Sequence, residues 1–278
     1  MANLLRRSAV FAGVLAAAGL IFVLGVYGAS AWKLSRTYDV PLKSPDQTLA
    51  PDASQGERMA RIVGCWAGCH GVRGEGGVEE IPGIRRVTAP PLGAVIPHYS
   101  DAELFRLILY GVKRDGTSAV GMSSYTFWPL GDPDVANIIH FLRQQPPAEP
   151  VPRTREIPLI SRFKLLAGDW QLSADQVDTS QTRWGNLPRE TSFERGRFLA
   201  AIVCAECHGS SYEGDPLEGG PPLVIMQAYS DAEFARLMRT GTSRSGLPVE
   251  PMSWLPDVQF TDRDIADLYE FLKLQTQQ

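Results

Sequence analysis

Cysteine, histidine and long basic stretches are scarce in this chain. Its 278 residues contain four cysteines and four histidines. The formal net charge is −4, and residues 151–278 carry 13 basic and 18 acidic side chains. The absence of a basic stripe argues against nucleic acid as a partner. We find no alternating strand pattern in the two repeated regions described below. The composition, 44% hydrophobic and 21% charged, is that of a globular protein without a disorder signature.

The N-terminal region holds the one long apolar run. Arg6 and Arg7 precede an apolar stretch over residues 8–32, and Lys33 follows it. A membrane-spanning helix needs about 20 apolar residues, and arginines before the run place the N-terminus in the cytoplasm. A cleaved signal peptide is the alternative, since Ala29-Ser30-Ala31 resembles a cleavage site. A signal-peptide core usually has about 7–15 residues, so we favour an uncleaved anchor. Either way, everything after residue 32 is exported.

The rest of the chain contains an internal repeat. Residues 99–103 and 229–233 both read Tyr-Ser-Asp-Ala-Glu, and 22 residues separate the serine from a methionine in each copy. From that methionine to a phenylalanine there are 19 residues in both copies. The copies differ upstream, because 20 residues separate His70 from Pro90 and only 13 separate His208 from Pro221. The first copy therefore carries about seven extra residues, around residues 73–86.

Each copy is expected to hold three main helices. Serine or threonine followed three residues later by glutamate is a capping box, which starts a helix. Such pairs are Ser54 with Glu57, Ser100 with Glu103, Thr191 with Glu194 and Ser230 with Glu233. Gly111 and Gly241 are expected to end the middle helices. The last helices are expected to start after Asp132-Pro133 and at Thr261, and both carry apolar residues at helical spacing.

The four cysteines form two close pairs, and each pair runs directly into a histidine. Cys204-Ala-Glu-Cys207-His208 is the C-x-x-C-H pattern of covalent haem attachment. Two thiols can bond the two vinyl groups of one haem, and the histidine is the usual proximal iron ligand. A thioredoxin-like redox pair of cysteines does not require the histidine that follows, and a zinc site needs four ligands.

The first motif has one extra residue. Cys65-Trp-Ala-Gly-Cys69-His70 is C-x-x-x-C-H. Its place in the repeat predicts a second haem, although attachment through Cys69 alone is the alternative for Cys65. A disulfide within the pair is another reading, but it leaves His70 unexplained.

The second axial ligand is predicted to be a methionine in each copy. Met122 and Met252 alone recur at matched positions far enough downstream of the histidines. His98 and His140 are rival ligands in the first copy. Their counterparts in the second copy are Ala228 and Glu270, which cannot serve in the same way.

These residues resemble the class I cytochromes c, and their pairing resembles the two-haem cytochromes of bacterial respiratory chains. The resemblance covers about residues 54–144 and 191–275. It implies small all-α domains, each wrapped around a covalently bound haem c. It also implies that a Gly-Pro-x-Leu element orients the proximal histidine through a backbone carbonyl. Gly220-Pro221-Pro222-Leu223 fits that element, and Ala89-Pro90-Pro91-Leu92 fits with alanine for glycine. Pro221 and Pro90 would then orient His208 and His70.

Histidine and methionine ligation on both irons predicts electron transfer without substrate binding. The expected partners are the membrane and redox proteins, such as a quinol-oxidising complex, a dehydrogenase or a terminal oxidase. A two-haem peroxidase with one open iron is the enzymatic alternative, and a fixed subunit of a larger complex is the alternative to a free-standing carrier.

The expected fold class is all-α, with two tandem cytochrome c-like domains and one N-terminal transmembrane helix. The chain would lie in a bacterial inner membrane with its haem domains in the periplasm. The expected order is a cytoplasmic N-terminus (1–7), the anchor (8–32), a linker (33–53), the first domain (54–144), a segment without an assigned role (145–190) and the second domain (191–278).

Overall fold

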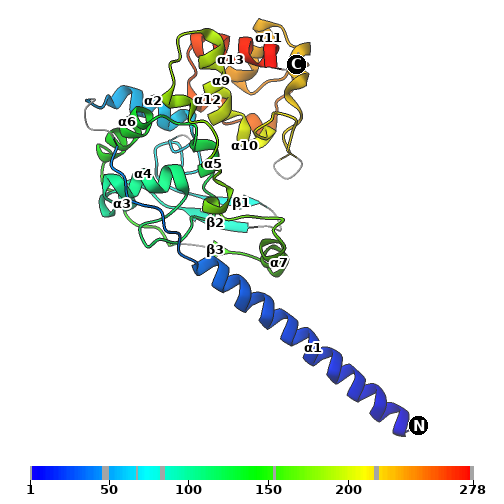
Figure 1. Cartoon of the computed structure of the whole chain (residues 1–278). Coiled ribbons are helices and arrows are strands. Elements are labelled where there is room, and N and C mark those ends of the chain that lie inside the picture. The colour runs from blue at the N-terminus through cyan, green and yellow to red at the C-terminus, as the bar shows by residue number, and fades with distance from the viewer. Residues whose placement is uncertain are drawn as a thin grey trace.

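The protein consists of two helical domains and a long N-terminal helix that extends away from them (Figure 1). The computed structural model describes residues 2–45, 50–66, 68–81, 85–152, 155–215 and 219–275. This mostly helical architecture, with one apolar N-terminal helix, is the predicted fold class. After helix α1 (Ala2–Ser35), the first domain contains α2 (Ala53–Ile62), β1 (Gly77–Ile81), β2 (Arg85–Ala89), α3 (Leu92–Val95), η1 (Ile96–His98), α4 (Asp101–Tyr110), α5 (Ser124–Phe127) and α6 (Asp132–Arg143).

The second domain repeats this order of helices. Between the domains lie β3 (Arg155–Glu156), α7 (Leu159–Ala167), α8 (Ser173–Gln176) and η2 (Trp184–Asn186). The second domain contains α9 (Ser192–Val203), α10 (Ala205–His208), η3 (Leu223–Ala228), α11 (Asp231–Thr240), η4 (Glu250–Met252), α12 (Leu255–Val258) and α13 (Asp262–Gln275).

Most of the helix ends follow from the sequence. Capping boxes start α4, α9 and α11 at Ser100, Thr191 and Ser230. Gly111 and Gly241 end α4 and α11 in the left-handed conformation, with φ of 65° and 63°. The prediction for α2 was wrong, because its N-cap is Asp52 and not Ser54. The Asp52 carboxylate accepts hydrogen bonds from the backbone N–H groups of residues 54 and 55, and so satisfies the first turn.

The first and last helices of each domain cross at a glycine. In the first domain α2 packs against α6, and in the second α9 packs against α13. A Cβ atom at Gly56 would lie 2.0 Å from the backbone oxygen of Asn137, and one at Gly196 would lie 2.0 Å from that of Asp267. Only glycine permits backbones to approach so closely. The matched contacts show that the sequence repeat is a repeat of structure.

The extra residues of the first domain form a β-hairpin, which the sequence analysis did not predict. Strands β1 and β2 pair antiparallel from Gly77 with Ala89 to Ile81 with Arg85, and β3 adds a short third strand. At the same place in the second domain, Asp215 and Gly220 form an isolated antiparallel bridge. The hairpin of the first domain thus stands where the second domain has this bridge. Of its described side chains only Val87 is buried, so no alternating apolar face marks the strands.

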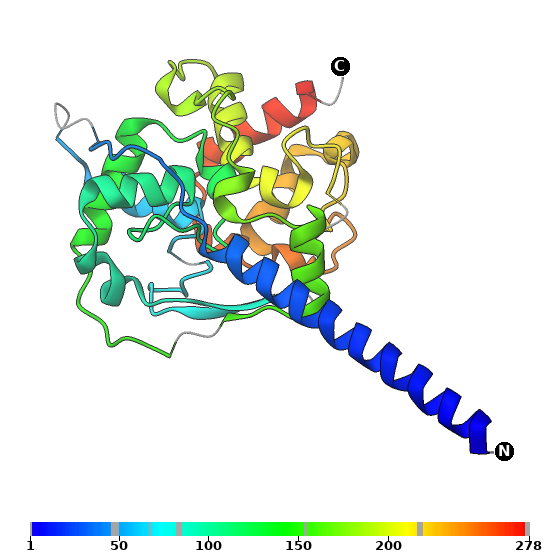
Figure 2. The same cartoon turned by 60° about the horizontal axis from the view of Figure 1, so that its bottom comes forward.

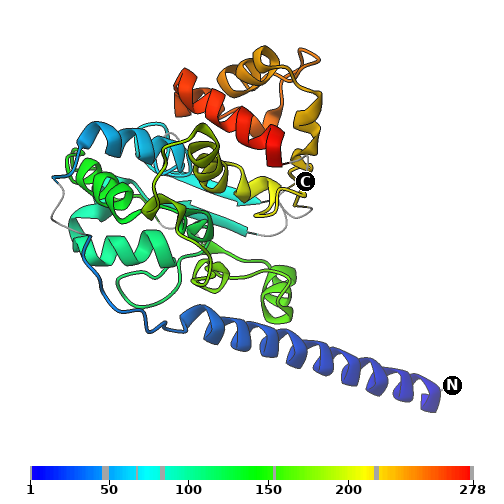
Figure 3. The same cartoon turned by 45° about the horizontal axis from the view of Figure 1, so that its top comes forward.

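The segment between the domains fastens α1 to the folded part. Helix α7 packs against α1, as three views show (Figures 1, 2 and 3). Leu34 of α1 shares a small buried cluster with Ile157, Leu165 and Leu172. The segment without an assigned role thus places α7 against the C-terminal part of α1.

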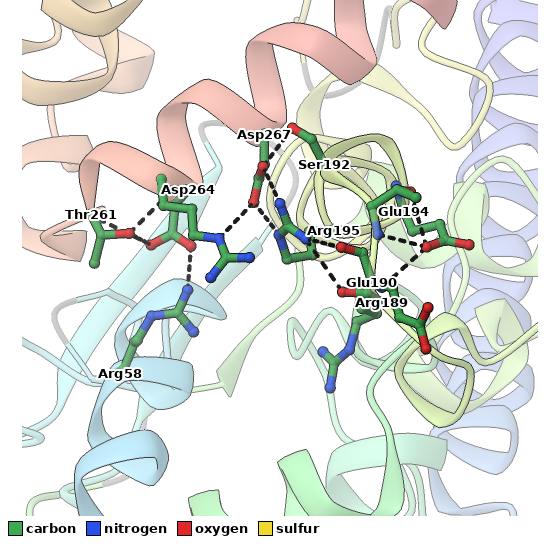
Figure 4. A network of polar contacts seen from close by, with 11 residues as sticks. Arg58, Arg189, Glu190, Ser192, Glu194, Arg195, Thr261, Asp264 and Asp267 are labelled. Carbon is green, nitrogen blue, oxygen red and sulfur yellow. Dashed lines mark hydrogen bonds and ion pairs between the residues drawn. The ribbon is translucent and has the colours of Figure 1, made fainter.

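The two domains are packed directly against each other. Arg58 of α2 forms an ion pair with Asp264 of α13, whose carboxylate also accepts hydrogen bonds from Thr261 (Figure 4). One hydrophobic core cluster runs through both domains. A neighbouring group in Figure 4 holds α9 to α13, where Asp267 accepts hydrogen bonds from Ser192 and Arg195 at 2.5 Å each.

Candidate haem-binding sites

The predicted site residues of the first domain line one cavity of about 880 Å³. The turns after α2 supply Cys65, Cys69 and His70, the end of β2 leads into Pro90, and the loop before α5 supplies Met122. The cavity lies within the range of volumes that hold cofactors. The walls between these residues are mostly apolar, with Leu92, Ile96, Leu104 and Phe127 among them. A flat, largely apolar cofactor fits such walls.

Both histidines are oriented by a proline carbonyl. His70 Nδ1 lies 2.8 Å from the backbone oxygen of Pro90, and His208 Nδ1 lies 2.7 Å from that of Pro221. A carbonyl oxygen can only accept, so Nδ1 carries the proton and donates in each case. This tautomer leaves the Nε2 lone pair available to a metal. The contact is the one that the resemblance implies for Pro90 and Pro221.

Burial sets the protonation of His70 and of one cysteine in each motif. Burial lowers the pKa of His70, although the hydrogen bond with Pro90 opposes that shift, so the imidazole is held neutral. Burial also raises the pKa of Cys65 to about 12 and that of Cys204 to about 12, and the neighbouring cysteine adds to each shift. A neutral histidine is the form that binds iron. No disulfide joins the cysteines of either motif in the part of the chain that the structure describes.

The second motif continues a helix. Cys204 ends α9, and Cys207 and His208 lie on the single turn of α10. His208 donates its backbone N–H to the Cys204 carbonyl at 2.9 Å, so the motif stays helical throughout. Met252 lies at the end of η4, partly buried against the hydrophobic core. The regular C-x-x-C-H spacing thus matches one turn of helix.

The first motif has no such turn. Helix α2 ends at Ile62, and the described residues from Val63 to His70 form turns, with Ala67 outside the described residues. Cys65 is buried and Cys69 is exposed, whereas Cys204 and Cys207 are both half-buried. The extra residue therefore places Cys65 and Cys69 in different environments, although both of these cysteines line the cavity.

The cavity of the first domain extends to the second, which the sequence analysis missed. Its lining includes Ile202, Cys207 and Trp254. Ser123, next to Met122, donates a hydrogen bond to Glu206, which lies inside the second motif. The methionine side of the first site thus faces the second attachment motif. No pattern in the sequence signals this contact, because it depends on how the two domains dock.

The rival histidines lie elsewhere. Neither His98, exposed on η1, nor His140 on α6 belongs to the described lining of the cavity. His140 Nε2 lies 2.9 Å from the Gln144 side-chain nitrogen on the same helix. His98 and His140 therefore lie on the surface or on a helix face, outside the described lining of the cavity.

Comparison with protein families gives one match in two places. The family model described as Cytochrome c matches residues 55–146 and 193–275, which together make up more than half of the chain. A search of curated proteins found no matching relative. The two matched regions coincide with the two halves of the repeat and contain every cysteine, both motif histidines and both candidate methionines.

Proposed function

Because the chain belongs to the cytochrome c family, we propose that this haem electron-transfer protein carries two covalently bound haems, one in each domain. The cavity that brings Cys65, Cys69, His70 and Met122 together is the observation that carries the proposal. The repeat extends the same assignment to Cys204, Cys207, His208 and Met252. The domains are taken as residues 54–144 and 191–278, of which the structure describes all but 67, 82–84, 216–218 and 276–278.

In this proposal the protein's own groups fix the cofactors and keep water away. When bound, haem supplies an iron that takes up and releases one electron. His70 and His208 present Nε2 as ligands because the carbonyls of Pro90 and Pro221 hold Nδ1–H. Met122 and Met252 would supply the second ligand to each iron, and thioether ligation would raise the reduction potential. Electron transfer without substrate chemistry is therefore the expected activity.

The two sites are proposed to act as a short intramolecular relay. Cys207, a predicted attachment residue of the second site, lines the cavity of the first. The Arg58–Asp264 ion pair and the continuous core hold the domains in this arrangement. The relay needs no movement of one domain against the other.

Helix α1 is proposed to be a retained anchor in a bacterial inner membrane, with both haem domains in the periplasm. Within the described residues, α1 is the one helix long and apolar enough to cross a membrane. Val26, Ser30 and Leu34 of α1 are buried by contact with the exported part. Cleavage after Ala31 would remove the first two of these residues. Retention is therefore supported by packing as well as by the length of the apolar run.

The proposed partners are redox proteins at the outer face of that membrane. A membrane-associated donor, such as a quinol-oxidising complex or a dehydrogenase, and an acceptor such as a terminal oxidase fit a tethered carrier, because tethering raises the local concentration. The acidic balance of residues 151–278 would favour a basic surface on one partner.

The intact mass of the purified full chain tests these proposals together. We expect a mass increase equal to two haems, with residues 1–31 present. A mass increase equal to one haem would contradict the assignment of the first motif, and loss of residues 1–31 would contradict the anchor. Cys69→Ser is expected to impair attachment at the first site. Catalytic turnover of peroxide by the two-haem protein would favour the peroxidase alternative.

A further inference from the structure

The helix between the domains, α7, has a buried side and an exposed side. The buried side carries Ser161 and Leu165, and Leu165 packs in the cluster that contains Leu34 of α1. The other carries Ile160, Phe163 and Leu166, of which Ile160 is 56% and Phe163 is 47% exposed. Residues spaced by three along a helix share one face. An exposed apolar face beside a long apolar helix indicates a surface that contacts an apolar partner.

The depth of this face follows from the contact between Phe163 and Phe22. Their ring centroids are 6.4 Å apart. The apolar run before Phe22 begins at Ser8, so it covers only 14 residues. At about 1.5 Å per residue this portion spans roughly 21 Å, which is shorter than the bilayer's hydrocarbon thickness of about 30 Å. Phe22 must then lie within the hydrocarbon if α1 spans the membrane, and Phe163 lies beside it.

The polar groups near this face are arranged as a membrane interface requires. The Arg162 guanidinium donates to Ser30 Oγ at 2.9 Å and lies 4.4 Å from the centroid of the Tyr27 ring. Lys33 donates from Nζ to the Leu165 carbonyl at 2.7 Å, in the last turn of α7. These contacts turn the charge of Arg162 toward α1 and satisfy a carbonyl at the end of α7. The outward face of α7 is left apolar.

We propose that α7 is a second membrane-contacting element, which inserts the face formed by Ile160, Phe163 and Leu166 into the outer leaflet beside α1. The occupant of this face is lipid, because the face continues the exposed apolar surface of α1. Amphipathic helices of this kind bind at the boundary between headgroups and acyl chains. The inference rests on the proposed anchoring of α1 and adds a fixed orientation of the haem domains on the membrane.

Spin labels on the haem-loaded full chain test this proposal in vesicles of phosphatidylcholine and phosphatidylglycerol. Phe163→Cys is the test position and Phe22→Cys is the reference for hydrocarbon. Leu247→Cys is the reference for water, because Leu247 is 66% exposed in the second domain, outside α1 and α7. Accessibility is measured to oxygen, which concentrates in lipid, and to a water-soluble nickel chelate. Burial in protein lowers both, whereas burial in lipid lowers only the second.

We expect the oxygen-to-nickel ratio at position 163 to exceed that at position 247 several-fold and to approach that at position 22. A ratio at 163 equal to that at 247, with position 22 embedded, would overturn the role of α7 and leave the anchor intact. An aqueous ratio at position 22 would overturn the anchor itself, and with it this inference. If Phe163→Cys fails to fold, Ile160→Cys on the same face replaces it. Haem content and reducibility of each variant report separately on electron transfer.

Discussion

The two cytochrome c domains share an architecture but differ in how the cysteine motif meets the rest of the domain. In the second domain the motif is one helical turn, and Gly220 lies directly beneath it. In the first domain the described residues of the motif form turns, the matching residue is Ala89, and strands β1 and β2 stand where the second domain has the bridge between Asp215 and Gly220. The difference teaches that spacing within the motif and the residue beneath it change together.

The position of one carbonyl explains this coupling. A Cβ atom on Gly220 would lie 1.9 Å from the Cys207 carbonyl oxygen. In the first domain the Cys69 carbonyl lies beside Gly77 instead, 3.2 Å from where a Cβ atom would stand. Because the extra residue moves that carbonyl, an alanine is tolerated at position 89. The alanine is therefore a consequence of the longer motif.

Gly220→Ala and Ala89→Gly test this explanation and should give the largest contrast. Gly220→Ala is expected to destabilise the second domain by about 3 kcal/mol or more, because the clash is with backbone and cannot relax easily. Ala89→Gly is expected to cost the first domain only about 0.5–1 kcal/mol, through added freedom of the unfolded chain. Denaturant unfolding followed by each haem's absorbance measures both. Equal costs would contradict the coupling between motif length and the residue beneath it.

Replacing the two methionines proposed as ligands compares the two sites directly. Met122→Ala and Met252→Ala are each expected to lower one reduction potential by at least about 0.1 V, within the roughly 0.8 V range that axial ligands cover. The other potential should stay unchanged. Redox titration of each variant measures the shifts. Electron paramagnetic resonance detects the high-spin iron expected where the methionine has been removed. Met59→Leu is a matched control, since Met59 is buried in the core and lies outside the described lining of the cavity. Two unshifted potentials in Met122→Ala would assign the first iron another ligand.

A smaller difference between the domains is expected in how their stability depends on pH. At the helix crossing the second domain has Asp267, paired with Arg195, where the first has the neutral Asn137. Burial opposes ionisation of Asp267, but hydrogen bonds from Arg195 and Ser192 outweigh it and lower its pKa. A lowered native pKa gives stability that is complete above the ordinary aspartate value of about 3.9 and is lost as pH falls through the native value.

Asp267 is therefore expected to contribute about 1.5 kcal/mol of stability, the scale of a charged hydrogen bond, and this contribution is lost on acidification, whereas the neutral Asn137 at the matching position of the first domain makes none. Asp267→Asn should remove this loss, and its own cost should vanish at low pH. Unfolding of the variant and the unsubstituted chain between pH 7 and pH 3 checks the sign. The same acid loss in Asp267→Asn would assign the effect to another carboxylate.

Local patterns in the sequence were enough to predict most of the fold. Capping boxes at Ser100, Thr191 and Ser230 and the glycine stops at Gly111 and Gly241 act within one helix, so residues a few positions apart determine them. The family match confirms the two cytochrome c domains that the repeat indicated. The cluster of Cys65, His70, Pro90 and Met122 around one cavity agrees with the repeat spacing, although their roles as ligands stay predictions.

Features that depend on contacts between distant segments were not predictable. The hairpin lacks an alternating apolar face, since only Val87 among its described residues is buried, so its strands leave no periodic signal. The N-cap of α2 is Asp52 and not the expected Ser54. Both are good capping residues, so only the crossing with α6 selects between them. At that crossing the Asn137 side-chain oxygen accepts a hydrogen bond from the Asp52 N–H at 2.8 Å. The approach of Cys207 to the first cavity arises from domain docking alone.

The shared wall of the first cavity bears on how this protein is assembled. Ile202, Cys207 and Trp254 complete that wall, so the first pocket is not closed until the second domain has folded against it. Excision of the second domain, or its exchange for a domain from another protein, would leave the first pocket open to water. The two domains are therefore one structural unit and not two interchangeable parts.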